Sequence, residues 1–142
     1  MAAQTFVYTH RVTYSECTVG NHVYYARYLD LLEEARNEFF RAIGAPLLRL
    51  QQNGTAFFVS ECHLHYRALA RYDDLLRIEM WVEELGRVRL TLGSRIINPE
   101  DKLVLEATTV LACTSCEEKP KRLPPELVKA LELFVGPVAP RD

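Results

Sequence analysis

Glu33 is the acidic residue of this sequence that is best placed to do chemistry. It lies at the margin of a stretch in which apolar residues recur every three to four positions, so we expect it on a helix beside an apolar face. A carboxylate that is partly removed from water there can act as a general base or a nucleophile. The alternative is structural, because Arg36 follows on the same helix and an ion pair between the two side chains is the commoner arrangement.

A second group of candidates precedes this helix. Glu16 and Thr18 fall in an irregular, polar segment, and catalytic groups often gather in such loops on a rigid scaffold. The same residues could instead form turn hydrogen bonds between side chain and backbone. His22 could donate a hydrogen bond to a substrate, although we favour a structural role for it at the start of the helix.

The backbone N–H groups at the beginning of the helix, around Tyr24 and Tyr25, are a further candidate. The first N–H groups of a helix have no acceptor within it, and they lie at the positive end of the helix dipole. Such donors polarise a carbonyl group or stabilise an oxyanion. Because every helix has them, this feature does not by itself identify a site.

The remaining candidates are metal ligands and basic side chains. Cys113 and Cys116 have CxxC spacing, but no second pair of ligands lies nearby, so we expect no metal site. Glu61, His63 and His65 share one face of an expected strand, which we interpret as a solvated or interface surface. Basic residues at strand ends and in loops could meet phosphate groups or be ordinary surface charges; they are Arg67, Arg71, Arg87, Arg89, Lys119, Lys121 and Arg122.

Composition and charge limit the class of protein. With 142 residues the sequence is long enough for a substantial core, and we expect one domain over residues 1–142. Hydrophobic residues make up 49% of it and the net charge is −2, which argues against a nucleic-acid-binding protein. We recognise no signal peptide and no apolar run that could cross a membrane. We therefore expect a cytoplasmic protein whose four cysteines are reduced.

The pattern along the chain predicts one strand, one long helix and four further strands. Residues 5–14 alternate with period two, and from about Val23 the period changes to 3.6 until Gly44 and Pro46 end the helix. The apolar arc of this helix is expected to comprise Leu29, Leu32, Arg36, Phe39, Phe40 and Ile43. Further strands are expected at 56–67, 75–84, 87–97 and 102–116. We also expect a short helix or turn at 47–52, a short helix at 123–134 and a frayed tail from residue 136.

These elements suggest an α+β fold. Short connections at residues 84–86 and 98–101 predict two consecutive hairpins among the last three strands and therefore an antiparallel meander. Because the long helix has one strongly apolar face, the simplest arrangement wraps a curved, five-stranded antiparallel sheet around it. The edge strands of such a sheet need cover, and pairing with a second subunit would provide it.

Residues 14–36 resemble the signature of hotdog-fold acyl-CoA thioesterases of the 4-hydroxybenzoyl-CoA thioesterase and YbgC type. That signature runs Y-x-D-x-D-x-x-G-x-V-x-x-x-x-Y-L-x-x-x-E-x-A-R, and the matching residues are Tyr14, Gly20, Val23, Tyr28, Leu29, Glu33, Ala35 and Arg36. Residues 66–74, YRALARYDD, are similar to the family's Y-x-x-P-A-x-x-D-D turn. Residues 119–124, KPKRLP, are similar to its closing K-P-x-R-x-P, so the resemblance covers nearly the whole chain.

One departure from the family concerns its catalytic acid. The second Asp of D-x-D falls at Thr18, which cannot be a carboxylate base, whereas Glu16 keeps the first acid. In the other large branch of hotdog thioesterases a polar non-acid holds this position, and the base lies fifteen residues later on the central helix, which here is Glu33. Enediyne polyketide thioesterases are also similar, with Glu at the position of Glu16 and Asn at that of Thr18.

The resemblance implies hydrolysis of an acyl-CoA or acyl-carrier-protein thioester, without a cofactor, between the subunits of a homodimer or of a dimer of dimers. Glu33 would activate water or attack the thioester, and Tyr25 N–H would polarise its carbonyl group. Thr18 and Glu16 would position water or substrate. Residues expected to bind substrate are His22, Tyr24, Arg67 and Arg89. Alternatives are a protein that binds acyl thioesters without hydrolysing them and a hotdog dehydratase, whose His and acid belong to a different motif.

Overall fold

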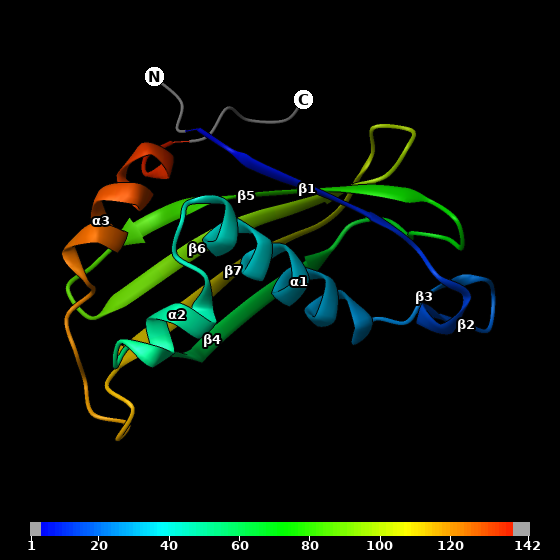
Figure 1. Ribbon diagram of the computed structural model, residues 1–142. Helices are drawn as coiled ribbons and strands as arrows, with labels where there is room; N and C mark the ends of the chain where they lie inside the picture. The colour runs from blue at the N-terminus through cyan, green and yellow to red at the C-terminus, as the bar shows by residue number, and fades with distance from the viewer. Residues whose placement is uncertain (1–3, 138–142) are drawn as a thin grey trace.

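The computed structural model describes residues 4–137 and shows one sheet with a long helix, α1 (Arg27–Ala42), across one of its faces (Figure 1). The sheet order is β1-β5-β6-β7-β4, and every neighbouring pair is antiparallel. The five strands are β1 (Phe6–Arg11), β4 (Ala56–Tyr66), β5 (Leu75–Leu85), β6 (Arg89–Ile97) and β7 (Leu103–Thr114). The expected α+β fold, a five-stranded antiparallel sheet around a central helix, is therefore confirmed.

The smaller elements lie at the ends of the sheet and before α1. They are η1 (Tyr14–Glu16), β2 (Cys17–Thr18), β3 (His22–Val23), α2 (Leu47–Gln52), α3 (Pro125–Leu131) and η2 (Glu132–Phe134). The pair β2–β3 forms a separate two-stranded ribbon, which the sequence pattern did not predict. Most of the tail that we expected to fray, residues 138–142, lies outside the described residues. Within residues 4–137 no helix is long and apolar enough to span a membrane.

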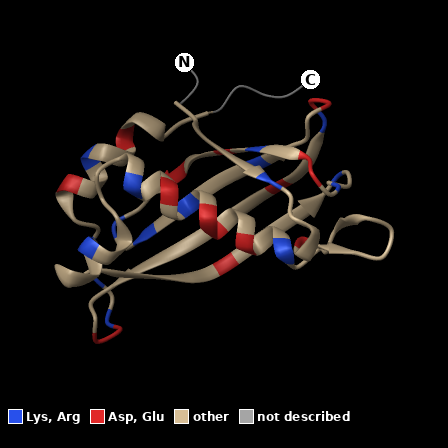
Figure 2. Cartoon of the chain, turned by 45° about the vertical axis from the view of Figure 1, so that its right-hand side comes forward, with Lys and Arg blue, Asp and Glu red and all other residues tan. Residues whose placement is uncertain are grey.

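Helix α1 buries a face that is rotated from the expected one. Leu31 and Ala35 are fully buried, whereas Leu29, which we expected in the apolar arc, is 47% exposed. The rotation arises because α1 packs toward β1 and β5, where Phe39 stacks on Phe6 at a centroid distance of 5.1 Å. Asp and Glu residues recur along the exposed turns of α1 (Figure 2). The side of α1 that carries Leu29 is left open toward β4.

Strand β4 forms one edge of the sheet and pairs only with β7 among the described strands. Three of its large apolar side chains, Phe58, Val59 and Tyr66, are between 47% and 51% exposed. Leu64 packs against the core, so His63 and His65 on either side of it point away from α1. An edge strand with this much exposed apolar surface is a typical place for another chain to pack.

Candidate functional site

The polar segment before α1 folds into a small hairpin. Strands β2 and β3 are antiparallel, and Thr18 lies directly opposite His22. The turn between them places Gly20 and Asn21 at φ values of 93° and 58°, a left-handed region that glycine and asparagine adopt at little cost. The hairpin therefore holds two of the predicted site residues side by side.

Helix α1 begins at Arg27, four residues later than the period-3.6 pattern suggests. Val23 N–H donates to Ala70 O at 2.8 Å, and Tyr24 N–H donates to Glu16 O at 2.9 Å. Both amides thus serve contacts outside the helix. Hydrogen bonds to Ala70 and to Glu16 in the preceding loop therefore determine where α1 starts. Helical periodicity in the sequence does not reveal such partners.

The next two amides differ from these, since the N–H groups of Tyr25 and Ala26 have no acceptor among residues 4–137. The peptide group that carries the Tyr25 N–H is nevertheless fixed on both sides. Tyr24 N–H is bonded to Glu16, and Tyr24 O accepts Arg27 N–H at 2.8 Å. The Tyr25 N–H is therefore a preorganised donor that is available to an oxygen atom of a ligand.

A pocket of about 330 Å³ opens beside this amide. Aromatic rings make up much of its wall: the Tyr25 and Tyr66 ring centroids are 6.4 Å apart, and those of Tyr28 and Tyr66 are 5.7 Å apart. Tyr66 OH also donates to Tyr25 O at 3.1 Å. The residues that line the pocket are Thr18, His22, Val23, Tyr24, Tyr25, Tyr28, Tyr66, Ala68 and Leu69. Four predicted site residues, Thr18, His22, Tyr24 and Tyr25, are thus brought together.

Tyr28 and Tyr66 are neutral hydrogen-bonding groups of the pocket rather than acids at neutral pH. Burial raises the pKa of the Tyr28 hydroxyl above its ordinary value, and the same cause raises the pKa of Tyr66. Tyr28 OH accepts the Ala70 N–H at 3.3 Å. No carboxylate is among the residues that line this pocket.

Glu33 lies on the open side of α1, outside the pocket lining. Its side chain is exposed and forms no hydrogen bond or ion pair with any described residue. The alternative ion pair with Arg36 is therefore absent, although the charge of Glu33 still acts on that guanidinium. Burial, the larger effect, lowers the pKa of Arg36, and the Glu33 charge opposes this. Two opposite charges thus lie near one another on a helix face without direct contact.

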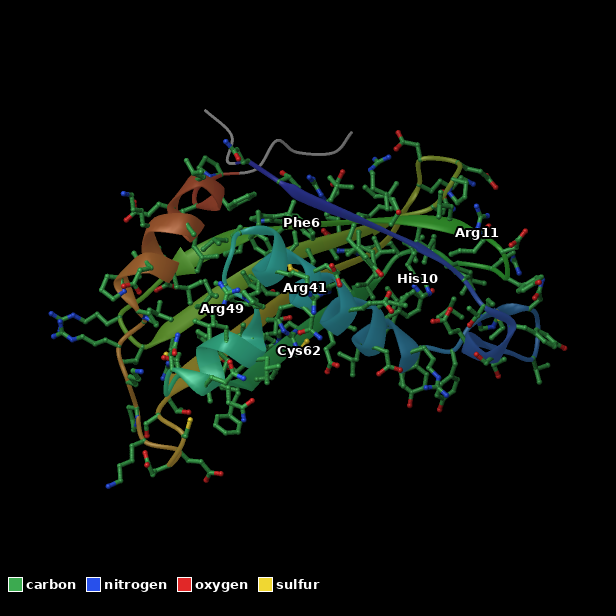
Figure 3. The ribbon with its side chains drawn as sticks, viewed as in Figure 1. Phe6, His10, Arg11, Arg41, Arg49 and Cys62 are labelled. Atoms are coloured by element: carbon green, nitrogen blue, oxygen red, sulfur yellow. The ribbon has the colours of Figure 1, made fainter. Side chains whose placement is uncertain are left out.

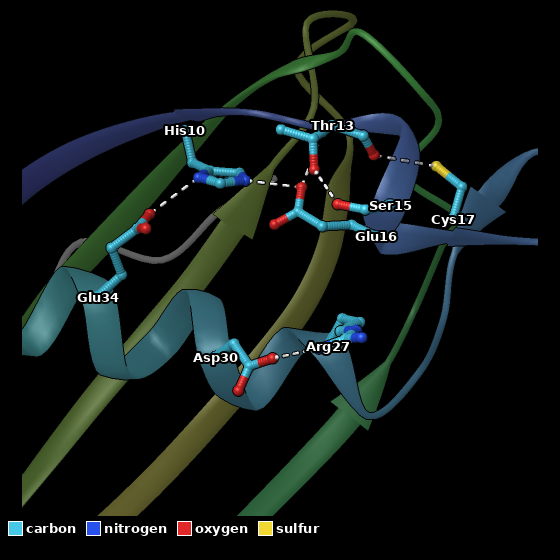
Figure 4. A network of polar contacts seen from close by, with 8 residues as sticks. All are labelled: His10, Thr13, Ser15, Glu16, Cys17, Arg27, Asp30 and Glu34. Carbon is cyan, nitrogen blue, oxygen red and sulfur yellow. Dashed lines mark hydrogen bonds and ion pairs between the residues drawn. The ribbon is translucent and has the colours of Figure 1, made fainter.

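Glu16 has very different surroundings. Its Oε1 accepts the Thr13 N–H at 2.8 Å and lies 2.9 Å from His10 Nε2, and the other ring nitrogen of His10 is 2.8 Å from Glu34 (Figure 4). His10 is on β1 and is directed toward α1 (Figure 3). Burial alone would raise the pKa of Glu16, but the hydrogen bonds from His10 and Thr13 outweigh it and hold that pKa below its ordinary value.

Two residues of this network, His10 and Glu34, were not candidates from the sequence alone. The period-two pattern placed the His10 side chain on one face of the first strand, but did not show that this face meets the polar segment before α1. Only the packing of β1 against both η1 and α1 brings the three side chains together.

The two arginines expected to bind substrate lie far apart. Arg67 follows β4 and pairs with Glu106 at 3.0 Å. Arg89 begins β6 opposite Ala112, which in turn is opposite Phe58 near the start of β4. Arg67 lies nine residues along the chain from Phe58, so at about 3.3 Å per residue the two arginines are roughly 30 Å apart along the strand direction. One chain alone does not bring Arg89 to the pocket.

The CxxC cysteines do not form a joint site. Cys113 is buried and its Sγ faces Arg122 O, whereas Cys116 is exposed and its Sγ faces Gln51 O. Burial raises the pKa of Cys113. Among the described residues, no group of three or more His, Cys, Asp and Glu side chains could hold a metal ion.

Comparison with known proteins adds independent evidence. The profile of the Thioesterase-like superfamily matches residues 12–131. The acyl-CoA thioester hydrolase YbgC of Escherichia coli is 33% identical over 119 residues, which are 83% of this chain and 89% of that protein. A hypothetical protein from Aquifex aeolicus superposes with a TM-score of 0.84 at 28% identity, over 89% of this chain and 98% of the other. The dynemicin thioesterase has a TM-score of 0.87 at 22% identity, over 94% and 99%, and shares the fold.

Proposed function

The chain belongs to the Thioesterase-like superfamily, and we propose that it hydrolyses an acyl-CoA, or another acyl thioester, to a carboxylic acid and a free thiol. The observation that carries the proposal is the fixed, unpaired Tyr25 N–H beside the tyrosine-lined pocket. The relative from Escherichia coli bears the name of the same reaction, which supports acyl-CoA as the substrate class.

In the proposed reaction the thioester carbonyl oxygen accepts a hydrogen bond from Tyr25 N–H. Glu33 removes a proton from water, and the water oxygen attacks the carbonyl carbon. The negative charge that develops on the carbonyl oxygen is stabilised by the same amide. The C–S bond then breaks, and the thiolate takes up the proton that Glu33 received. Thr18 positions water or substrate, and Glu16 holds the segment that carries these groups.

The substrate contacts come from two parts of the chain. His22 and Tyr24 line the pocket beside the reacting carbonyl group. We assign Arg67 and Arg89 to the phosphate-bearing end of a CoA substrate, where guanidinium groups pair well with phosphate oxygens. Because these two arginines are distant within one chain, the assignment requires a second copy of the chain.

We place the site between two subunits that pair along β4. Antiparallel pairing of β4 with its copy would cover the exposed edge and set the first half of one strand beside the last half of the other. Arg89 of one subunit would then lie near Arg67 and the pocket of the other. The same pairing would cover the open side of α1 and exclude water around Glu33. A dimer of dimers would use the outer sheet face that carries Glu61, His63 and His65.

Release of free CoA tests the proposal directly. The purified protein is incubated with acyl-CoAs of increasing chain length and with aromatic acyl-CoAs, and the liberated thiol is measured. We expect saturable release well above the uncatalysed rate for at least one substrate. If no member of the panel, and no acyl carrier protein thioester, releases its thiol, hydrolysis is contradicted.

A second function, binding of acyl thioesters without hydrolysis, is favoured by one observation. The pocket lining contains no carboxylate, since Thr18 holds the position of the family acid. Saturable binding of acyl-CoA, measured by calorimetry, with no thiol release from any substrate would select this function.

We also propose which acyl carriers the site accepts and in which cellular compartment the reaction takes place. CoA and acyl carrier protein present the same pantetheine thioester, so both suit a site that recognises the carbonyl group and the pantetheine arm. We place the reaction in the cytoplasm, because all four cysteines are free thiols, as is typical of reducing compartments.

A further inference from the structure

His10 lies between two carboxylates that come from different elements. Its Nε2 is 2.9 Å from Glu16 in η1, and its Nδ1 is 2.8 Å from Glu34 in α1. The His10 side chain is only 13% exposed and that of Glu16 is 16% exposed, whereas Glu34 is 43% exposed. The network therefore joins β1, the segment before the hairpin and the middle of α1 (Figure 4).

The number of protons on the imidazole ring decides how many of these contacts are hydrogen bonds. Ionised carboxylates only accept hydrogen bonds, and a neutral imidazole has a single N–H. Both contacts are hydrogen bonds at once when the ring carries two protons, and they are then charge-assisted. The other groups near the bridge are the Thr13 N–H on Glu16, the Tyr8 hydroxyl beside Glu34 and, from β5, the apolar Leu76 opposite His10.

Glu16 connects this bridge to the Tyr25 amide. Its side chain is held by His10 and by Thr13 N–H, and its backbone carbonyl accepts the Tyr24 N–H at 2.9 Å. The peptide group between Tyr24 and Tyr25 carries the free N–H, and both residues line the pocket. A displacement of Glu16 would therefore turn that N–H away from its direction, and an error of about 1 Å in such a position can cost on the order of a hundredfold in rate.

We propose that His10 is a positioning residue for thioester hydrolysis: by bridging Glu16 and Glu34 it fixes the backbone that aims Tyr25 N–H at the substrate carbonyl oxygen. The inference rests on the proposed function above. His10 is not among the residues that line the pocket, so we assign its effect to its contact with Glu16.

The first test is kinetic and uses His10→Gln. We expect kcat to fall about ten- to a hundredfold while KM stays within about threefold, because an oriented transition-state contact is lost and ground-state binding is not. Glu34→Gln should lower kcat in the same direction by a smaller factor. The double variant should be no worse than His10→Gln alone, because the two side chains act as one unit.

The matched control is Glu38→Gln, one turn further along α1. Glu38 is 41% exposed, close to the 43% of Glu34, and its carboxylate pairs with Arg41 instead of His10. We expect its kcat and KM to match the unmodified protein. An equal loss in Glu34→Gln and Glu38→Gln would show a general effect of helix charge and overturn the positioning role.

The second test is amide hydrogen exchange without substrate. In His10→Gln the Tyr24 amide, bonded to Glu16, should exchange at least about tenfold faster. The neighbouring Val23 amide, bonded to Ala70 at 2.8 Å, should keep its protection and is the internal control. Equal acceleration at both would indicate general loosening and contradict the proposal.

The outcomes separate this inference from the proposed function. If the unmodified protein hydrolyses thioesters and His10→Gln keeps its kcat, the positioning role is overturned and the function stands, whatever the exchange rates. If the unmodified protein releases no thiol from any substrate, the function fails, and the positioning role fails with it. Loss of kcat with selective acceleration at Tyr24 supports both.

Discussion

The two sides of helix α1 differ in how many contacts their side chains make within one chain. On the side facing β1, Glu34 reaches His10 and, through it, Glu16, and the adjoining segment holds the Tyr25 amide in place. On the side facing β4, Glu33 is exposed and forms no hydrogen bond or ion pair with a described residue, and Leu29 is 47% exposed. One side is preorganised and the other is open.

From this difference we infer which part of the proposed reaction a single chain can provide. The donor for the carbonyl oxygen is complete without a partner. The proposed base is not, because an exposed carboxylate is well solvated and lies outside the pocket. We infer that a second subunit along β4 completes the side that carries Glu33, and variants on the two sides of α1 should therefore behave differently.

The largest effect is expected for the open side. Glu33→Gln should lower kcat by about 10² to 10⁴ with the fold retained, because the amide cannot accept the proton of the attacking water. Thiol release at saturating substrate measures it, with circular dichroism as the check on folding and Glu38→Gln as the control. An unchanged rate would rule out Glu33 as the base.

The next effect concerns the preorganised side. Tyr25→Pro removes the backbone N–H, whereas Tyr25→Ala removes the same ring and keeps that N–H. Relative to Tyr25→Ala, we expect Tyr25→Pro to lower kcat by about 10² to 10³, the usual loss when an oxyanion donor is removed. Equal kcat values in two folded variants would contradict the role of this amide.

A charge placed on the edge strand β4 should reduce both dimer formation and thioester hydrolysis. Val59→Lys places a charge on the exposed edge β4, where Val59 is 51% exposed, and should convert dimer to monomer in light scattering with a parallel loss of kcat. Val7→Lys is the matched control, because Val7 is 48% exposed on the other edge strand, β1. A fully active monomeric Val59→Lys would show that one chain suffices.

The smallest effect is a pH dependence of stability. The pKa of Glu16 is lowered in the folded protein from its ordinary value of 4.5, so its ionised form stabilises the fold above that pH. Glu16→Gln should cost about 1 kcal/mol of unfolding free energy at pH 7, because the contacts of Glu16 with Thr13 and His10 weaken.

The stability advantage of Glu16 over Gln should shrink as the pH falls, because the pKa of Glu16 is lowered in the folded protein. As pH falls below 4.5 toward the lowered pKa, Glu16 becomes protonated in the folded protein and its advantage over Gln is lost. Denaturant unfolding of both proteins between pH 7 and pH 3 measures this. A difference that stays constant over that range would contradict the ionic role of Glu16, and Glu117→Gln, in an exposed turn, is the control.

The strands and helices could be predicted because their signals are local. Alternation in residues 75–84 and the 3.6 period around Leu32 depend only on neighbouring residues, and the observed β5 and α1 contain them. The rotation of α1 could not be predicted in the same way. Which side of an apolar arc is buried depends on where β1 and β5 lie, and Leu29 is left exposed for that reason.

Half of the candidate site residues from the sequence share one pocket, and their arrangement could not be predicted. Thr18, His22, Tyr24 and Tyr25 line this pocket, whereas Glu16, Glu33, Arg67 and Arg89 lie outside its lining. The late start of α1 and the bridge through His10 depend on partners that no periodicity shows. The roles of these residues in catalysis stay predictions until they are measured.

The most direct test of the central claim is a crystal structure of the protein with a non-hydrolysable acyl-CoA analogue. We predict that the analogue's carbonyl oxygen lies about 3 Å from Tyr25 N, and that the Glu33 carboxylate lies within about 3 to 4 Å of the carbonyl carbon or of a water beside it. A second subunit paired along β4 should cover Glu33 and contact the analogue. A carbonyl group bound away from Tyr25 N–H, or a Glu33 that remains in open solvent, would contradict the account.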